Sequence, residues 1–152
     1  MRKEIVTREN KNVKQLGRIL YHDGIYYLGY SASEIGFYYD GDRILADIVT
    51  DDWRKEEGRE GYAGVFIGEE ETPWKRIPLK EAEAEYDLFD RAAYAAAKGI
   101  RPEDLPRELS VRIVKYSEAA FGAMGIRCLL VDDGAVLRPL PEKKRKIEFI
   151  GD

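Results

Sequence analysis

The residues best suited to chemistry in this chain are few, and the first set to weigh surrounds its one histidine. His22 is followed by Asp23, and Ser31 and Ser33 come shortly after. A serine, a histidine and an aspartate can act as nucleophile, base and the group that orients the base. However, His22-Asp23-Gly24 has the composition of a tight turn, which would hold an imidazole poorly for proton transfer. We therefore interpret these residues as two polar turns.

Three further patterns could belong to a metal or phosphate site. Each lacks the number or the spacing of residues that such a site needs. Acidic residues gather in one charged region: Asp47, Asp51, Asp52, Glu56 and Glu57. Their spacing matches no calcium-binding loop, so we interpret them as a solvated surface. One cysteine and one histidine cannot supply the three or four ligands that zinc takes. The glycines at 17, 24 and 29 are not spaced as in a phosphate-binding loop. We expect no metal and no cofactor.

A basic run near the C-terminus, Lys143 to Lys146, has the composition of a nucleic-acid patch. It follows Pro139 and Pro141 and is followed directly by an apolar run. We therefore interpret residues 139–146 as an exposed linker. The whole chain carries a net charge of −4, which provides no broad basic field for a nucleic acid. We expect no nucleic-acid partner.

Several features bear on the cellular compartment. The segment after Met1 has basic residues but no apolar run behind them, so it does not resemble a secretory signal peptide. No segment approaches the roughly 20 apolar residues of a membrane helix, so we expect no membrane partner. Cys128 is the one cysteine, so it has no partner for an intrachain disulfide, which fits a reducing compartment. Together these features predict a cytoplasmic protein.

Ten tyrosines and two tryptophans supply planar rings with a polar group, which suit a core but also stack on sugars. Trp53, Tyr62 and Trp74 lie at or beside expected loops, and charged residues surround Trp53 on both sides. In Tyr26-Tyr27 and Tyr38-Tyr39, neighbouring rings would point to opposite strand faces, so one of each pair should be exposed. We interpret most of the rings as core and keep Trp53, Tyr62 and Trp74 as candidates for substrate binding.

The elements that would position these residues are short apolar runs broken by glycine and aspartate. The runs that we expect to be strands are 16–21, 25–30, 35–39, 43–50, 62–67, 74–79, 85–89, 111–116 and 126–131. Asp23-Gly24 and Asp40-Gly41 have the composition of hairpin turns, and Asp133-Gly134 that of a further turn. Pro78 places its strand at an edge or a strand end. Short strands with regularly spaced turns predict an all-β antiparallel sandwich or barrel.

One segment breaks this rhythm. Residues 91–98 include five alanines, which favour a helix, and Gly99 is a suitable stop. Because Pro102 and Pro106 keep the following chain irregular, residues 91–106 are interpreted as a helical insertion between two strands. The chain thus divides into a flexible N-terminal segment 1–12, a sandwich 13–138, the linker 139–146 and a last strand-like segment 147–152.

The last seven residues, Lys-Ile-Glu-Phe-Ile-Gly-Asp, look like the first strand and nucleophile motif of the SGNH (GDSL-type) hydrolases. In that superfamily the strand ends in Gly-Asp-Ser, and the serine is the nucleophile. Gly151 and Asp152 would flank that serine, which would be the next residue. In addition, residues 13–30, 31–37 and 111–125 resemble the N-terminal domain of carbohydrate esterase family 2 proteins, the acetyl xylan esterase-like enzymes. The alanine-rich insertion is the main departure from that pattern.

This resemblance implies a jelly-roll-like β-sandwich followed by an α/β hydrolase domain that removes acetyl groups from polysaccharides such as xylan. The chain would then be a non-catalytic accessory domain, its partner would be its own C-terminal SGNH hydrolase domain, and the nucleophile would lie outside it. Residues 147–152 would find no sheet of their own here and would be disordered, packed on a neighbouring molecule or added to a sheet edge.

Two other functions remain open from the sequence. One is an independent carbohydrate-binding module, which should expose a line or platform of aromatic rings. An accessory domain should instead expose an apolar patch where the hydrolase packs. The other is a stand-alone enzyme, which would need a nucleophile and base within this chain.

Overall fold

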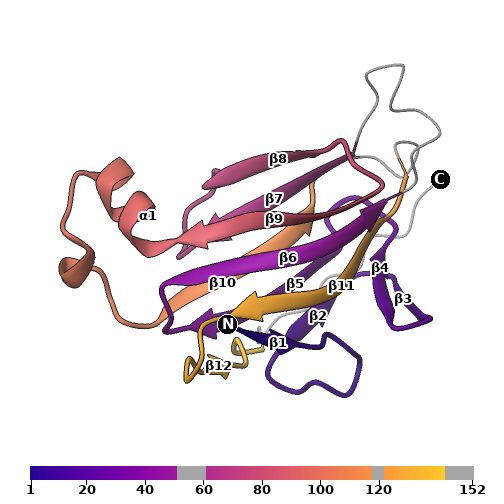
Figure 1. The fold of residues 1–152 in the computed structure, drawn as a ribbon, viewed down its shortest axis with the longest axis horizontal. Helices are drawn as coiled ribbons and strands as arrows, with labels where there is room; N and C mark the ends of the chain where they lie inside the picture. Colours follow the sequence, from indigo (N-terminus) through magenta and orange to yellow (C-terminus); the bar gives the residue numbers. More distant parts are fainter. Residues whose placement is uncertain (51–60, 118–121, 143–152) are drawn as a thin grey trace.

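The computed structural model describes residues 1–50, 61–117 and 122–142. Within them, two antiparallel sheets pack face to face around one core (Figure 1). The first sheet has the strand order β3 (Ile19–His22), β4 (Ile25–Leu28), β11 (Met124–Val131), β6 (Arg43–Thr50) and β9 (Glu83–Asp90), with β1 (Arg2–Glu4) beside β11. The second has the order β12 (Leu137–Arg138), β5 (Glu34–Tyr39), β10 (Leu109–Lys115), β7 (Gly61–Ile67) and β8 (Lys75–Leu79), with β2 (Lys14–Leu16) beside β5. This confirms the all-β antiparallel sandwich.

The core lies between the two sheets because each strand alternates apolar and polar side chains. In β6, the side chains of Ile44, Ala46 and Ile48 are fully buried, whereas the intervening residues are partly exposed. The paired tyrosines behave as predicted. Tyr26 and Tyr39 are buried in the core, and their neighbours in sequence point outward and are only partly buried.

The Asp23-Gly24 turn joins β3 to β4 as a hairpin, as the sequence predicts. Asp23 has φ 50° and Gly24 has φ 75°. Two successive positive φ angles are typical of the tight turn that matches the twist of paired strands. The two strands pair in register from Ile19 opposite Leu28 to His22 opposite Ile25.

The expected strand 16–21 is instead divided between the two sheets, so that prediction was wrong. Its first part, β2, pairs with β5 in the second sheet, and its second part, β3, pairs with β4 in the first. Gly17 lies at the break with φ 97°, where a side chain would be strained. In the N-terminal segment expected to be flexible, Arg2–Glu4 forms β1 against β11.

The Asp40-Gly41 hairpin is a second prediction that the structure corrects. β5 and β6 belong to different sheets, so the turn carries the chain across the sandwich. Tertiary contacts hold it there: the Tyr39 hydroxyl donates to the Arg43 carbonyl at 2.7 Å, and the Asp132 carboxylate accepts from backbone N–H groups of the turn. A Cβ atom at Gly41 would overlap the Tyr39 ring, so glycine is needed for this close approach.

Helix α1 (Arg91–Lys98) has the predicted bounds and projects at the opposite end of the sandwich from the β3–β4 hairpin (Figure 1). Gly99 ends it with φ 71°, and a 3-10 turn (Pro102–Asp104) follows. Among the described strands, β8, which contains Pro78, pairs with β7 alone and lies at the sheet edge, as expected. No helix in the described ranges has the length and apolar character needed to span a membrane.

Replacing Asp90 with alanine is expected to lower the free energy of unfolding by about 1 kcal/mol. Asp90 caps α1, because its carboxylate accepts a hydrogen bond from the Ala93 backbone N–H at 3.1 Å. Asp90→Asn keeps a capping oxygen but loses the charge that lies 3.9 Å from the Arg43 guanidinium. Urea unfolding should place Asp90→Asn close to the parent chain. Equal losses in the two variants would assign the effect to the ion pair rather than to the cap.

Candidate functional site

The histidine and serines considered for catalysis do not come together. His22 is exposed, and its Nε2 lies 3.2 Å from the Asp23 Oδ2. The Ser31 hydroxyl donates to the Ser117 carbonyl at 2.9 Å, and Ser33 is buried. No hydrogen bond joins His22 to either serine, which agrees with the interpretation as polar turns.

The acidic region does not form a ligand cluster within the described residues. Asp47 is directed toward Arg127, with Oδ2 and Nη1 3.4 Å apart. The other acidic residues of that region, 51–57, lie outside the described residues. Across the described ranges, no group of three or more histidine, cysteine or carboxylate side chains is placed to hold a metal ion. Burial raises the pKa of the Cys128 thiol, which disfavours the reactive thiolate.

Trp74 packs toward the helix rather than forming an open surface. Its ring meets the Tyr94 ring edge-on with the centroids 5.1 Å apart, and Tyr94 in turn packs against Phe89. The Trp74 indole N–H is buried without a hydrogen-bond partner in the described part of the chain. The ring therefore joins α1 to the sandwich. Trp53, Gly151 and Asp152, the other residues singled out from the sequence, lie outside the described residues.

Tyr62 belongs to a continuous outward-facing cluster on the second sheet. The Arg76 guanidinium carbon lies 4.4 Å from the centroid of the Tyr62 ring and 5.9 Å from that of Tyr116. Phe66 meets Tyr116 edge-on at 6.1 Å, and Arg112 lies 4.7 Å over Phe66. Arginine over an aromatic face is a favourable electrostatic contact. We name these five residues the arginine–aromatic face.

Strand alternation builds this face. In β7, Tyr62 and Phe66 point away from the core, whereas Ala63, Val65 and Ile67 point into it and are fully buried. Gly64 lies between the two rings, and a Cβ atom there would come within 3.2 Å of the Tyr116 ring. The absence of a side chain at this position lets the Tyr116 ring lie close to the strand.

Beside the arginine–aromatic face lies a depression of about 560 Å³. It is lined by Leu16, Ser31, Ala32, Glu34, Phe66, Arg112, Val114, Lys115, Tyr116 and Ser117. Leu16 is 50% exposed and Tyr116 43% exposed, so apolar groups meet solvent here. The charged groups are paired: Arg112 Nη1 lies 3.2 Å from the Glu34 carboxylate, and the Lys115 ammonium donates to a backbone carbonyl at 2.8 Å.

The last described residues lie across the same surface. A Cβ atom at Gly36 would be 2.7 Å from Leu140 Cδ1, so the leucine side chain rests on the bare backbone of β5. The Lys14 ammonium donates to the Pro141 carbonyl at 3.0 Å. Leu140 and Pro141 of the expected linker therefore contact the second sheet, and residues 143–146 lie outside the described residues.

In the described part of the chain, this surface presents half-exposed apolar groups beside charges that are already paired. Sequence reasoning found Tyr62 and missed Phe66, Arg76, Arg112 and Tyr116, because a strand interior was expected to be core. A usable signal was present. Residues 62–67 alternate along a strand, which places the rings of Tyr62 and Phe66 on one face and the small and branched residues on the other.

Comparison with known proteins identifies the fold. No family model and no curated protein sequence matches the chain. Among solved structures, it is similar to an acetyl xylan esterase from the rumen bacterium Butyrivibrio proteoclasticus, with TM-score 0.70 and 14% identity over 95% of this chain and 35% of that one. It is also similar to a family two carbohydrate esterase from Clostridium thermocellum in complex with cellohexaose, with TM-score 0.68 and 18% identity over 92% and 37% of the two chains.

A third similar structure is a salicylyl-acyltransferase from a tetracycline biosynthetic pathway, with TM-score 0.66 and 12% identity over 95% of this chain and 43% of that one. The chain therefore spans well under half the length of these three proteins. At such low identity the likeness shows the fold, which is shared by proteins of different named activities.

Proposed function

We propose that the chain is the non-catalytic N-terminal accessory domain of an SGNH/GDSL-type carbohydrate esterase. In this proposal it supports or shapes the substrate cleft of a hydrolase domain that follows it. Two facts support the idea: the fold matches about a third of the length of several carbohydrate esterases, and residues 146–152 resemble the strand that leads to the nucleophile. Gly151 and Asp152 would then precede the catalytic serine.

The proposal rests on the depression of the second sheet and on Leu140 and Pro141, which lie on the same face. Half-exposed Leu16 and Tyr116 rim it. Half-exposed apolar side chains beside paired charges would suit a docking surface, with an apolar centre and a polar rim. Leu140 and Pro141 are held on the same face, so a domain that continues the chain would emerge beside the surface that it has to cover.

The arginine–aromatic face suits such an interface. Arginine and aromatic residues are enriched in the buried centres of protein interfaces. Because Arg112 is already paired with Glu34 at 3.2 Å, docking would not leave an uncompensated charge there. The chain itself would do no chemistry, since acyl transfer needs a nucleophile with a base in reach.

The alternative is an independent carbohydrate-binding module. Sugar stacking requires free ring faces, and Tyr116 is 43% exposed beside the Glu34–Arg112 pair. Against this, Arg76 lies over both Tyr62 and Tyr116, which leaves less open ring surface for a glycan. The accessory-domain proposal therefore has the stronger support. The proposed setting is cytoplasmic, with acetylated carbohydrate as the substrate class of the whole enzyme.

The test compares p-nitrophenyl acetate hydrolysis by this chain and by the product of the complete gene. We expect activity only in the longer protein, and its loss when the residue after Asp152 is changed to alanine. A complete gene that encodes no further domain, or an inactive longer protein, would reject the esterase proposal.

A matched pair of variants tests the docking surface. Leu16 on the second sheet and Leu20 on the first are both exposed leucines, at 50% and 63%. In the longer protein, Leu16→Gln is expected to lower the thermal midpoint by a few degrees, because a buried leucine contributes about 1.5–3 kcal/mol. Leu20→Gln should leave it unchanged. Equal effects of the two substitutions would place the interface elsewhere.

A further inference from the structure

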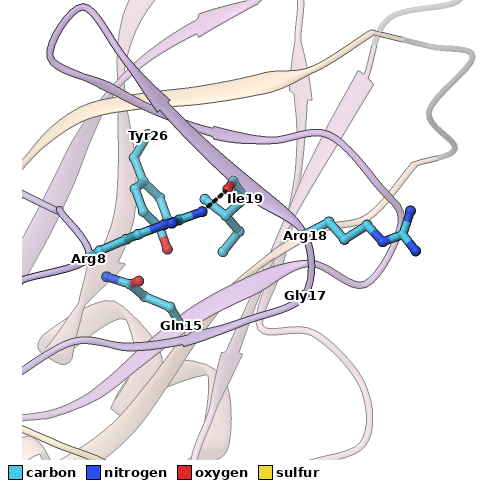
Figure 2. A pocket seen from close by; sticks show the side chains of 6 residues that line it. All are labelled: Arg8, Gln15, Gly17, Arg18, Ile19 and Tyr26. Atoms are coloured by element: carbon cyan, nitrogen blue, oxygen red, sulfur yellow. Dashed lines mark hydrogen bonds between the residues drawn. The ribbon is translucent and has the colours of Figure 1, made fainter. Parts of the chain in front are cut away.

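A second depression, of about 510 Å³, lies where the chain passes from β2 in the second sheet to β3 in the first. It is lined by Arg8, Gln15, Gly17, Arg18, Ile19 and Tyr26 (Figure 2). Two of these residues are cationic and none is acidic. The depression shares no lining residue with the one on the second sheet, so the arginine–aromatic face does not account for it.

Arg8 supplies a solvent-exposed positive charge at the depression. One of its guanidinium nitrogens donates to the Ile19 carbonyl at 3.3 Å, and no carboxylate of the described residues lies within ion-pair distance of it. By contrast, Arg43 and Arg138 each face a carboxylate. A guanidinium with unused N–H groups in a depression favours a planar carboxylate, because two parallel hydrogen bonds can form.

Tyr26 supplies a hydroxyl group without a partner. The residue is only 1% exposed, and its hydroxyl makes no hydrogen bond within the described residues. Burial raises the pKa of Tyr26 to about 12, against an opposing effect of the Arg8 charge. The hydroxyl therefore stays protonated and able to donate at neutral pH. Tyr26 lines the depression, so a ligand oxygen placed there can accept a hydrogen bond from its hydroxyl.

Gln15 supplies an acceptor. Its Nε2 donates to the Thr7 carbonyl, which leaves its Oε1 free for a donor. In Figure 2 the Arg8 side chain, the Tyr26 hydroxyl and the Gln15 amide converge, whereas Arg18 extends away from them. The Arg18 guanidinium lies 5.7 Å from the Tyr30 ring instead.

Gly17 forms part of the wall of the depression, at the passage from β2 to β3. Gly17 has φ 97°, and a Cβ atom there would lie 2.8 Å from the Ser33 hydroxyl oxygen. Ser33 is itself buried. A side chain at position 17 would therefore be strained and crowded, and glycine leaves this part of the wall bare.

We infer that this depression binds a sugar acid of the uronate type, a carboxylate with hydroxyl groups beside it. The carboxylate lies on Arg8, the Tyr26 hydroxyl donates to a ligand oxygen, and a ligand hydroxyl donates to Gln15 Oε1. A neutral sugar would form no charge-assisted hydrogen bonds with Arg8. A phosphate ion carries mainly acceptor oxygens and would meet the Gln15 acceptor unfavourably. The inference does not depend on the esterase proposal, because all its residues lie within this chain.

The test is a titration of this chain with D-glucuronate, followed by calorimetry and by the backbone amide resonances of Gly17 and Ile19. We expect saturable binding that shifts these resonances. Arg8→Gln should weaken it about tenfold or more, because a charge-assisted pair is lost. Tyr26→Phe should weaken it about three- to tenfold. Arg101→Gln, which removes the same charge from an exposed turn far along the chain, should leave it unchanged.

Gln15→Glu provides a variant at the exposed rim that keeps an acceptor but adds a negative charge, and it should abolish binding. Circular dichroism of each variant checks that the fold is retained. The inference is overturned by an absence of saturable binding up to about 50 mM glucuronate. It is equally overturned if methyl glucoside or inorganic phosphate binds as well as glucuronate, or if Arg101→Gln weakens binding as much as Arg8→Gln.

Discussion

Replacing Arg91 with methionine is expected to destabilise the sandwich by about 3–5 kcal/mol. The Arg91 side chain is 4% exposed although it is charged. Its guanidinium donates twice to the Gly41 carbonyl, at 3.2 and 3.1 Å, and once each to the carbonyls of Pro106 at 3.0 Å and Arg107 at 2.8 Å. Methionine fills a similar volume but leaves all three carbonyl groups without these donors.

The effect is large because the Arg91 side chain contacts three separate segments of the chain. It is the first residue of α1, Gly41 lies in the crossover between the two sheets, and Pro106 and Arg107 precede β10. The Asp42 carboxylate lies 3.4 Å from Arg91 Nε and partly balances its charge. Burial lowers the pKa of the guanidinium from a starting point so basic that it stays charged near neutrality.

Arg107→Met provides the matched control. Arg107 pairs with the same Asp42 carboxylate at 3.3 Å, but its side chain is 68% exposed. Exposed ion pairs contribute little, so this variant should lose less than about 1 kcal/mol. Urea unfolding of both variants gives the comparison. A loss at Arg91 as small as that at Arg107 would show that solvent replaces the guanidinium without penalty.

Elements encoded by neighbouring residues could be predicted from the sequence. The Asp23-Gly24 hairpin depends on two adjacent residues that accept positive φ angles. The helix at 91–98 depends on its own alanines and on Gly99, which ends it in the left-handed conformation. In both cases the determining interactions lie within a few residues, where a local pattern reports them directly.

Asp40-Gly41 shows where local patterns stop being informative. Its composition matches that of Asp23-Gly24, yet it connects strands of two different sheets and forms no hairpin. The difference comes from Asp132, whose carboxylate and backbone N–H contact the turn and Tyr39 from about 90 residues away. No feature of residues 35–50 alone encodes that contact.

The candidate site was only partly predictable, because its contacts also join residues that are far apart in the chain. Tyr62 could be singled out as an aromatic residue near a loop, but Trp74 shared that description and packs on Tyr94 instead. The role of Arg112 depends on register, because β10 places it opposite Phe66 on one side and Gly36 on the other. Pairing between strands so distant in the chain is set by the whole fold and not by a motif.

Raising the pH from 10 to 12 is expected to unfold the domain through its buried tyrosines. Burial raises the pKa of Tyr26, Tyr39 and Tyr94 to about 12 each, from 10 in an unfolded chain. The neutral hydroxyl is favoured in the fold, so this contribution is fully present below pH 10 and is lost as the pH rises toward 12. Each group then removes up to about 1.4 kcal/mol per pH unit, and three together rival the stability of a typical domain.

Tyrosinate absorbance and circular dichroism, followed together during an alkaline titration, test this expectation. Some of the ten tyrosines should ionise only as the fold is lost. Tyr26→Phe is the most direct variant, because the Tyr26 hydroxyl makes no hydrogen bond in the described residues and its removal deletes one late-ionising group. The variant should therefore unfold at a higher pH than the parent chain. Ionisation of all the tyrosines while the fold persists would contradict the prediction, since the buried hydroxyls would then be accessible to solvent in the native state.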